Sequence, residues 1–418
     1  SGLMGSMSGS VITNVLTTGA LSIPAMKRTG FSPHYAGGVE ACASTGGVLM
    51  PPIMGSTAFV MATYLEVPYS DIVIAAVIPS VLYFFGLFIQ IDSYAARMKL
   101  EGLPKEEMPS VRKTLFEGWH YVTVFALLIW MLMFLQREAL APYYATVLLI
   151  VINQFIKASR WDFNGFIDFI VGVGRLFVEL AAILAGIGMI VGALSLTGKI
   201  STLANELLSM AGDSVVVLLM MGALASFIMG IGVTVTVAYI ILAITLAPAL
   251  TESGLNPMAV HLFMLYWGML SFITPPVALG AFAAASLAQA KPMRTGFEAM
   301  RLGSVIYFIP FFFVLNPALI MQGEWGEIIN VFSTAVIGII LLAGALQGYL
   351  LGVGNVATHS VLQWPIRGVL LLAALLFAVP GGEFTGYANL ELALAGAVVL
   401  APAVALTWFL NRGVAATA

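Results

Sequence analysis

The sequence predicts an all-α polytopic membrane protein built from two inverted repeats with re-entrant hairpins and discontinuous helices. The 418 residues are 60% hydrophobic and only 9% charged, with a mean hydropathy of +1.01. Soluble domains carry about 25% charged residues, so lipid is the solvent that fits this composition. Many apolar stretches also approach the roughly 20 residues that a spanning helix needs. Finally, one pattern of prolines and glycines occurs twice along the chain.

Two apolar stretches, 1–27 and 213–250, carry Gly, Ser and Thr near their midpoints and predict re-entrant hairpins. A segment containing Arg175 and Glu179, paired at i and i+4, predicts an amphipathic helix along the membrane interface. The remaining apolar stretches predict membrane crossings at about 36–65, 70–96, 118–136, 141–157, 178–197, 258–290, 302–321, 330–351, 367–380 and 391–410.

Basic residues predict the orientation, because cytoplasmic loops are enriched in Lys and Arg. The loop 97–117 contains five of them, and Lys157 and Arg160 follow two crossings later on the same side. Arg137 and Lys199 fall on the opposite side, so the rule acts as a bias. The five basic residues of the loop are Arg97, Lys99, Lys105, Arg112 and Lys113.

An internal repeat appears when the sequence is shifted by 224 positions. Four prolines and one glycine coincide without a gap: Pro24 with Pro248, Gly30 with Gly254, Pro33 with Pro257, and Pro51-Pro52 with Pro275-Pro276. Three predicted crossings separate the copies, and an odd number inverts the second. We therefore expect a first repeat at 1–117, scaffold helices with the interfacial segment at 118–212, a second repeat at 213–323 and a C-terminal transmembrane extension at 324–418.

The proline pairs predict where polar chemistry lies at membrane depth. Proline removes a backbone donor and clashes with the preceding turn, which frees carbonyl groups. Freed carbonyls and hydroxyls are hard oxygen ligands for a small cation, and half-helix N-termini attract an anion. These residues also permit close helix packing, an alternative that stays open for any single position. The predicted cation ligands are Ser44, Thr45, Gly46 and Gly47 before the first pair, with Gly230, Gly232, Thr234, Ser271 and Thr274 in the second copy.

Four residues are candidates for the anionic substrate. Ser8 and Ser10 lie at the first hairpin tip, Asn14 follows on its second limb, and Thr236 follows the second tip. A helix-contact hydrogen bond is an equal alternative for Asn14. Glu40 lies about two turns into a predicted crossing, where a charge is costly. It is a candidate to bind substrate, carry a proton or pair with a cation, although a direct role in transport is less favoured than a structural one.

The side chains typical of metalloenzymes are sparse. One cysteine, Cys42, excludes an intramolecular disulfide framework and a multi-cysteine metal site. The four histidines, His34, His120, His261 and His359, have no ligand spacing. The sequence has no His-Glu-x-x-His run, no paired intramembrane aspartates and no Ser/His constellation, so an enzyme is not expected. Nor is an organic cofactor or a nucleic-acid partner expected.

The repeated motifs resemble the large membrane subunit of TRAP transporters, and more narrowly the fused permease of the TAXI branch. In the first copy the resemblance lies in 5–15 (GSMSGSVITNV), 23–30 (IPAMKRTG) and 40–55 (EACASTGGVLMPPIMG). In the second it lies in 230–234 (GIGVT), 247–250 (APAL), 273–279 (ITPPVAL) and 291–296 (KPMRTG). It covers about 1–323. Val233 departs from the Leu-Pro expected at the second tip, which affects the expected tip geometry.

The resemblance implies an elevator-type transporter of the ion-transporter superfamily, in the cell inner membrane. It implies uptake of a small organic anion, an organic acid or amino acid, with Na+ as coupling ion and a periplasmic TAXI-type substrate-binding protein. Small-subunit helices would precede this region, as a missing N-terminal part of a fused chain or as a separate chain. A binding-protein-independent sodium- or proton-coupled symporter is the alternative, and a channel, which needs no sodium sites or moving domain, is less favoured.

Overall fold

The computed structural model describes residues 1–104, 110–156, 160–212, 214–356, 361–382 and 385–415. Lys105, Lys157 and His359, which were considered above, lie outside these residues. The chain divides into two compact units. The first contains Ser1–Leu65, Val73–Gly102 and Ala204–Ala418, and the second contains Glu66–Ile72 and Leu103–Leu203.

The first unit begins with a helical hairpin and a helix that ends at a proline pair. The hairpin turns at Gly9, whose positive φ of 63° suits glycine, and the Ser10 hydroxyl caps the next helix. The third helix begins at Pro33, which is favourable at a first helical position. It ends before Pro51-Pro52, and a new helix begins at Gly55. These helices are α1 (Gly2–Ser8), α2 (Val11–Arg28), α3 (Pro33–Leu49) and α4 (Gly55–Leu65).

A second stretch of this unit has the same order of elements. It contains α11 (Val215–Met229), α12 (Val235–Thr245), α13 (Ala247–Glu252), α14 (Pro257–Met269), the 3-10 helix η2 (Leu270–Phe272) and α15 (Leu279–Ala288). Four boundaries lie 224 positions after their counterparts: Val11 and Val235, Arg28 and Glu252, Pro33 and Pro257, Gly55 and Leu279. Both proline pairs are joined by cis peptide bonds.

The two stretches pack against each other at the core of the first unit. The helix α15 contacts α2 and α3, and α12 contacts α4. The long helix α5 (Tyr69–Met98) approaches α17 and α18 at Gly86, where an added Cβ would meet Val305 at 2.6 Å and Ile339 at 3.2 Å. The connecting elements are α16 (Pro292–Leu302), α17 (Val305–Leu315) and the 3-10 helix η3 (Pro317–Ile320).

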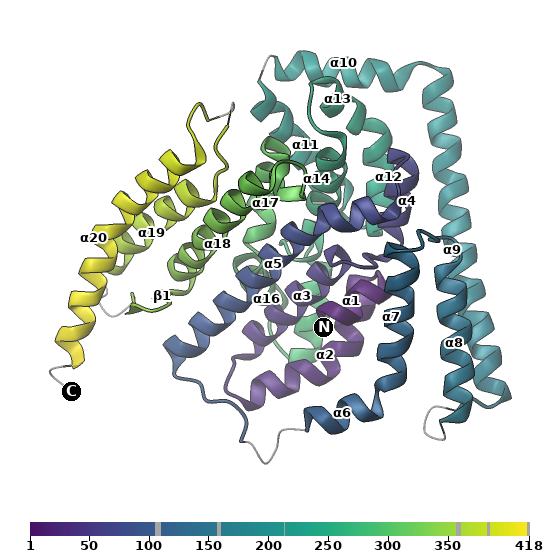
Figure 1. Ribbon diagram of the computed structural model, residues 1–418, viewed down its shortest axis with the longest axis horizontal. Coiled ribbons are helices and arrows are strands. Elements are labelled where there is room, and N and C mark those ends of the chain that lie inside the picture. The colour runs from purple at the N-terminus through teal and green to yellow at the C-terminus, as the bar shows by residue number, and fades with distance from the viewer. Residues whose placement is uncertain (105–109, 157–159, 213, 357–360, 383–384, 416–418) are drawn as a thin grey trace. The chain divides into compact units, whose positions relative to one another are not determined.

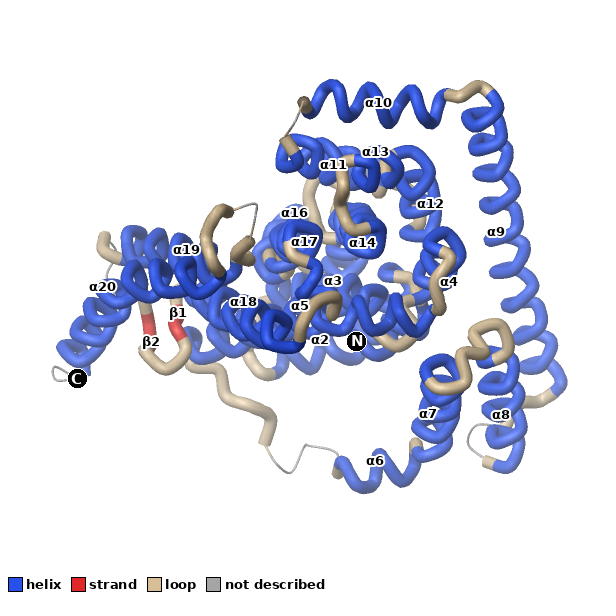
Figure 2. Tube along the Cα trace, turned by 45° about the horizontal axis from the view of Figure 1, so that its top comes forward, coloured by secondary structure: helices blue, strands red, loops and turns tan. Residues whose placement is uncertain are grey.

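The C-terminal part of the first unit is a three-helix layer. The helix α18 (Trp325–Gln347) packs on α19 (Gln363–Ala378), which packs on α20 (Asn389–Ala415), and the three lie side by side in Figure 1. Between α18 and α19 the chain forms two short antiparallel strands, β1 (Tyr349–Leu350) and β2 (Gly354–Asn355), with Tyr349 opposite Asn355. The strands are red in Figure 2, and β2 contacts α20.

The second unit contains α6 (Val111–Glu117), α7 (Trp119–Met133), α8 (Ala141–Phe155) and α9 (Phe163–Leu196). The helix α10 (Lys199–Ala211) follows across the boundary between the units. The helices α7 and α8 pack against each other. The helix α9 begins 15 residues before the predicted crossing at 178 and runs through both Arg175 and Glu179 without a break. The charged pair therefore lies inside one continuous apolar helix, and a separate amphipathic helix is not formed there.

Five described helices are long and apolar enough to cross a membrane: Tyr69–Met98, Phe163–Leu196, Pro292–Leu315, Trp325–Gln347 and Asn389–Phe409. A bent pair, α6 with α7 at 69°, raises this number to six. Several predicted crossings are instead composed of shorter apolar helices. The predicted crossing at 258–290, for example, is formed by α14 and α15 on either side of a proline pair. The structure supports a mostly helical polytopic membrane protein.

Candidate functional site

A buried carboxylate, Glu40, organises the polar contacts of the first hairpin. Its side chain is 1% exposed. Three hydroxyl groups donate hydrogen bonds to Oε1, from Thr18 at 2.6 Å, Ser1 at 2.8 Å and Ser44 at 3.2 Å. The Ser22 hydroxyl donates to Oε2. These residues and Asn14 form what we call the first cluster: Ser1, Asn14, Thr18, Ser22, Glu40 and Ser44.

Asn14 connects the two limbs of the hairpin with α3. Its Nδ2 donates to the Ser44 hydroxyl at 2.9 Å and to Ser1 at 3.0 Å. Its Oδ1 is buried and has no hydrogen-bond partner among the described residues. Buried polar atoms are almost always paired, so an orphaned oxygen indicates a missing ligand or water. An amide oxygen beside a carboxylate and hydroxyls is a donor set that suits a small hard cation.

The other predicted ligands on α3 face in different directions. The Thr45 hydroxyl donates to the Ala41 carbonyl of its own helix at 2.8 Å. Gly46 faces α5, where an added Cβ would lie 2.2 Å from Tyr83. Gly47 packs on the hairpin, with an added Cβ 2.7 Å from the Gly5 Cα. Of the four predicted positions on α3, Ser44 and Gly47 therefore face the hairpin.

The first hairpin tip lies beside the start of α4. An added Cβ on Gly9 would lie 2.9 Å from the Gly55 Cα. Ser8 is exposed and Ser10 is half-buried, and the Ser10 hydroxyl accepts the Thr13 amide at 3.4 Å. Neither hydroxyl reaches Glu40 in this structure, since their bonds stay within the tip.

In the second copy, the end of α11 touches the C-terminal part of α14. An added Cβ on Gly230 would lie 2.0 Å from the Gly268 carbonyl oxygen, so only glycine fits this contact. The buried Ser271 hydroxyl donates to the Gly230 carbonyl at 2.8 Å. The buried Ser226 hydroxyl has no partner among the described residues. These four residues, Ser226, Gly230, Gly268 and Ser271, form the second cluster.

The remaining predicted ligands of the second copy lie outside this cluster. The Thr274 hydroxyl is hydrogen-bonded to the Tyr307 hydroxyl at 2.5 Å. Gly232, with a φ of 79°, and Thr234 are exposed at the hairpin tip. The Thr234 hydroxyl caps α12 by accepting the Val237 amide at 3.5 Å.

Thr236 connects the two copies. Its hydroxyl lies 2.9 Å from the Thr57 hydroxyl and 3.1 Å from the Ser56 hydroxyl. Thr57 and Ser56 lie in the first turn of α4, and Thr236 lies in the first turn of α12. Since Gly9 and Gly55 are also in contact, the N-termini of α2, α4 and α12 converge. Each N-terminus carries unpaired N–H groups and partial positive charge, which favours an anion.

Several residues of these contacts were not identified from the sequence. Thr18 and Ser22 follow Asn14 on α2 at intervals of four, as Ser44 follows Glu40 on α3. This spacing places each set on one helix face, so the sequence alone could have predicted that these side chains lie together. Ser56, Thr57, Ser226 and Tyr307 carried no such pattern. No group of three or more metal-binding His, Cys, Asp or Glu side chains occurs among the residues that the structure describes.

A helical membrane bundle whose polar groups gather at paired helix breaks and hairpin tips has the features of a secondary transporter. The family model of the tripartite ATP-independent periplasmic transporter, DctM component, matches residues 1–328. The chain therefore belongs to this family of membrane transport components. The match covers both clusters and ends within the first residues of α18.

The chain is similar to curated permeases. It is 22% identical over 299 residues to the isethionate TRAP transporter permease protein DctMQ of Oleidesulfovibrio alaskensis, covering 68% of this chain and 45% of the relative. It is 25% identical over 293 residues to the C4-dicarboxylate TRAP transporter large permease protein DctM of Pseudomonas aeruginosa, covering 68% and 66%. The 2,3-diketo-L-gulonate TRAP transporter large permease protein YiaN of Escherichia coli is 22% identical over 289 residues, covering 66% and 64%. The chain spans less than two thirds of the length of these relatives.

Proposed function

We propose that this protein is the permease of a sodium-coupled secondary transporter that takes up a small organic anion. The observation that carries the proposal is the convergence of the N-termini of α2, α4 and α12 at Gly9, Gly55 and Thr236, beside a buried carboxylate cluster. Helix N-termini attract an anionic substrate, and oxygen-rich pockets attract a cation. The similar permeases named for isethionate, C4-dicarboxylate and diketogulonate support an organic anion as substrate.

The first cluster would hold one sodium ion. The orphaned Asn14 Oδ1 and the Glu40 carboxylate supply oxygens, and the Ser44 hydroxyl and the carbonyls near Gly47 complete the set. A carboxylate ligand places a full negative charge in the pocket, which distinguishes this site from one built of hydroxyls and carbonyls alone. Of the roles considered for Glu40, pairing with a cation is therefore the one that we propose.

The second cluster would hold a second sodium ion. The Gly230 carbonyl, the Ser271 hydroxyl and the orphaned Ser226 hydroxyl are its nearest oxygens. Thr274 would not contact this ion directly, because its hydroxyl is hydrogen-bonded to the Tyr307 hydroxyl. The exposed tip residues Gly232 and Thr234 would join this second sodium site when the hairpin closes, and Ser8 and Ser10 of the first tip would contact the substrate.

The matching helix boundaries support two repeats, and the basic loops support their inversion. An inverted pair of hairpins offers one gate on each side of the membrane. We infer an elevator motion, in which the two stretches around the clusters slide as a body against the helices of 118–212. The family relationship supports our proposal that the chain lies in the cell inner membrane.

We propose that a periplasmic binding protein of the TAXI type delivers the substrate, and that small-subunit helices complete the permease. Uptake into proteoliposomes tests the whole proposal. The full-length permease and its cognate binding protein are reconstituted with an inward sodium gradient, and radiolabelled organic acids are screened. Uptake requires both the gradient and the binding protein if the proposal holds. Uptake that ignores sodium would refute the coupling, and uptake without the binding protein would favour a binding-protein-independent symporter.

A further inference from the structure

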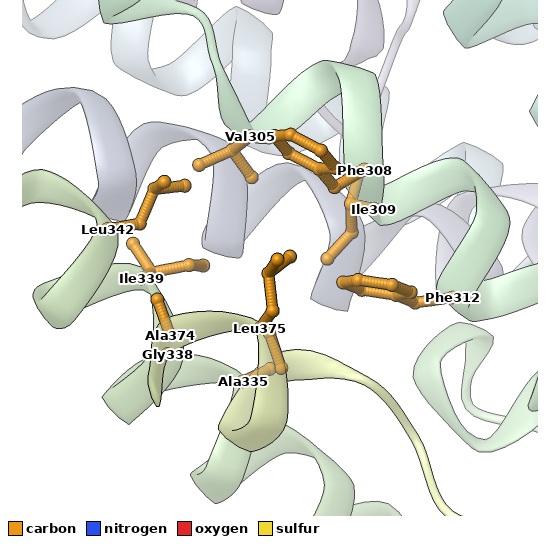
Figure 3. Close-up of a pocket in the computed structure, with 11 residues that line it drawn as sticks. Val305, Phe308, Ile309, Phe312, Ala335, Gly338, Ile339, Leu342, Ala374 and Leu375 are labelled. Atoms are coloured by element: carbon orange, nitrogen blue, oxygen red, sulfur yellow. The ribbon is translucent and has the colours of Figure 1, made fainter. Parts of the chain in front are cut away.

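An apolar groove lies between the core helix α17 and the C-terminal helices α18 and α19. Figure 3 shows side chains of all three helices pointing into it. Its cavity volume is only about 30 Å³, so it is a shallow groove along which a chain could lie, and its lining is almost entirely apolar. The residues that define it include Phe308, Phe312, Ile339, Leu342, Leu375 and Ala378. Phe308 is 39% exposed, so the groove opens toward the surroundings of the protein.

Two arginines lie where the groove's walls approach the C-terminal end of α18. Arg367 donates from Nε to the Ala345 carbonyl at 2.5 Å and from Nη2 to the Leu346 carbonyl at 2.9 Å. Arg97, at the end of α5, donates from Nη1 to the next carbonyl, Gln347, at 2.6 Å. Because the three carbonyls are consecutive, the two guanidinium groups are neighbours.

The described residues place no acidic partner beside either arginine. Among the described residues, no carboxylate oxygen lies within the 4 Å of an ion pair of Arg97 or Arg367, whereas Arg301 pairs with Glu298 at 2.5 Å. A guanidinium has five N–H donors, and the bonds above use one in Arg97 and two in Arg367. Trp364 lies beside this pair, with the Arg367 Cζ 5.1 Å from its ring centre. Tryptophan is enriched at the level of lipid headgroups.

The groove and the arginine pair lie close together along α18 and α19. Leu342 precedes Ala345 by three residues and Arg367 precedes Ala374 by seven, which corresponds to rises of about 5 Å and about 10 Å. The basic loop after α5 places this end on the cytoplasmic side, where the leaflet carries anionic lipids.

We propose that this place binds one anionic phospholipid, with its phosphate on Arg97 and Arg367 and an acyl chain lying along the groove. Capping of α18 by two cations accounts for the three carbonyl bonds. It does not account for the spare donors, the unpaired charges and an apolar groove that begins about a turn away. The lipid would join the C-terminal helices α18 and α19 to α5 and α17, independently of the transport reaction.

The experiment measures lipid binding to the full chain in detergent by native mass spectrometry and by thermal unfolding. Four probes are compared: dioleoyl phosphatidylglycerol, dioleoyl phosphatidylcholine, dihexanoyl phosphatidylglycerol and inorganic phosphate. We expect one retained dioleoyl phosphatidylglycerol and a higher melting temperature with it alone. The short-chain lipid tests the groove, and inorganic phosphate tests whether a free anion suffices.

Two pairs of variants separate the headgroup from the chain. Arg97→Gln with Arg367→Gln should weaken phosphatidylglycerol binding about 30-fold, at about 1 kcal/mol for each arginine. Arg112→Gln with Lys113→Gln, on exposed basic residues of α6, is the control. Leu375→Trp fills the groove and should reduce retention of the long-chain lipid, whereas Leu372→Trp, on the exposed face of α19, should not.

If the glutamine variant does not fold, Arg97→Lys with Arg367→Lys replaces it. That variant retains the charges, so its preference for phosphatidylglycerol over phosphatidylcholine should persist. Three results would overturn the proposal: an unchanged lipid preference in the glutamine variant, loss of preference in the lysine variant, or equal stabilisation by inorganic phosphate.

Discussion

The contact between Gly230 and Gly268 offers a sharp test of the second cluster. Replacing Gly230 with alanine places a Cβ 2.0 Å from the Gly268 carbonyl oxygen. Alanine is compatible with the backbone there, because φ is −71° and ψ is −11°. Gly230→Ala therefore acts through this contact and not through local conformation. Since ordinary contact begins at 3.4 Å, α11 and α14 have to separate by about 1.4 Å.

The separation also lengthens the bond from the Ser271 hydroxyl to the Gly230 carbonyl, which is 2.8 Å in the native protein. Overpacking in a core costs about 1 to 3 kcal/mol. Loss of a buried hydrogen bond adds about 0.5 to 1.5 kcal/mol. We therefore expect the free energy of unfolding to fall by roughly 2 to 4 kcal/mol, and sodium affinity to fall at least about tenfold, which needs only about 1.4 kcal/mol.

The assay is thermal unfolding of the purified protein across a sodium series, with ionic strength held constant by choline. Gly222→Ala is the matched control, because it lies on the same helix and its added Cβ meets side chains at 3.5 to 3.6 Å, an ordinary contact. Gly222→Ala should keep the native sodium response. If Gly230→Ala also keeps native stability and sodium response, the close approach does not build a sodium site and the reasoning fails.

Three further variants test the remaining contacts. Glu40→Gln removes the buried charge while keeping the shape of the side chain, and should raise the sodium concentration for half-maximal stabilisation at least about tenfold. The control Glu252→Gln, on an exposed side chain, should leave this concentration unchanged. An unchanged concentration in both variants would remove Glu40 from the ion site. Ser44→Ala should weaken sodium-dependent uptake more than Thr45→Ala, whose hydroxyl is used within its own helix, and the reverse order in an uptake titration would contradict the assignment. Thr57→Val removes the hydrogen bond to the Thr236 hydroxyl, so half-maximal uptake should need about tenfold more substrate while the sodium response stays native. An unchanged substrate dependence would show that this contact is not part of the substrate site.

The helix breaks were predictable because proline acts locally. A proline pair removes donors and ends a helix whatever surrounds it, so the interruptions at Pro51 and Pro275 follow from residue type alone. The offset of 224 carried over to the observed helix boundaries for the same reason: caps, N1 prolines and turn glycines act through nearest neighbours. The start of α9 was missed because hydropathy falls around Arg175 and Glu179, although helix geometry tolerates both charges.

The sequence was less able to predict which residues are the cation ligands, because this depends on the direction in which each side chain points. Thr45 and Ser44 are neighbours of similar chemistry, yet one hydroxyl bonds within its helix and the other joins Glu40 and Asn14. About 100° of helical rotation separates them, and only packing decides which of the two faces the hairpin.

The amino-acid sequence alone was enough to predict a membrane protein whose helices break at two equivalent places. It also predicted that small polar residues gather at both breaks. Composition, proline and glycine act through short-range physical chemistry, so these properties can be read without coordinates. The tertiary structure decided that Glu40 meets both limbs of one hairpin, that Gly230 touches Gly268, and that Arg97 lies beside Arg367 at the end of α18. Those contacts join residues 18 to 270 positions apart, and they exist only because burial of many other side chains holds the helices in register.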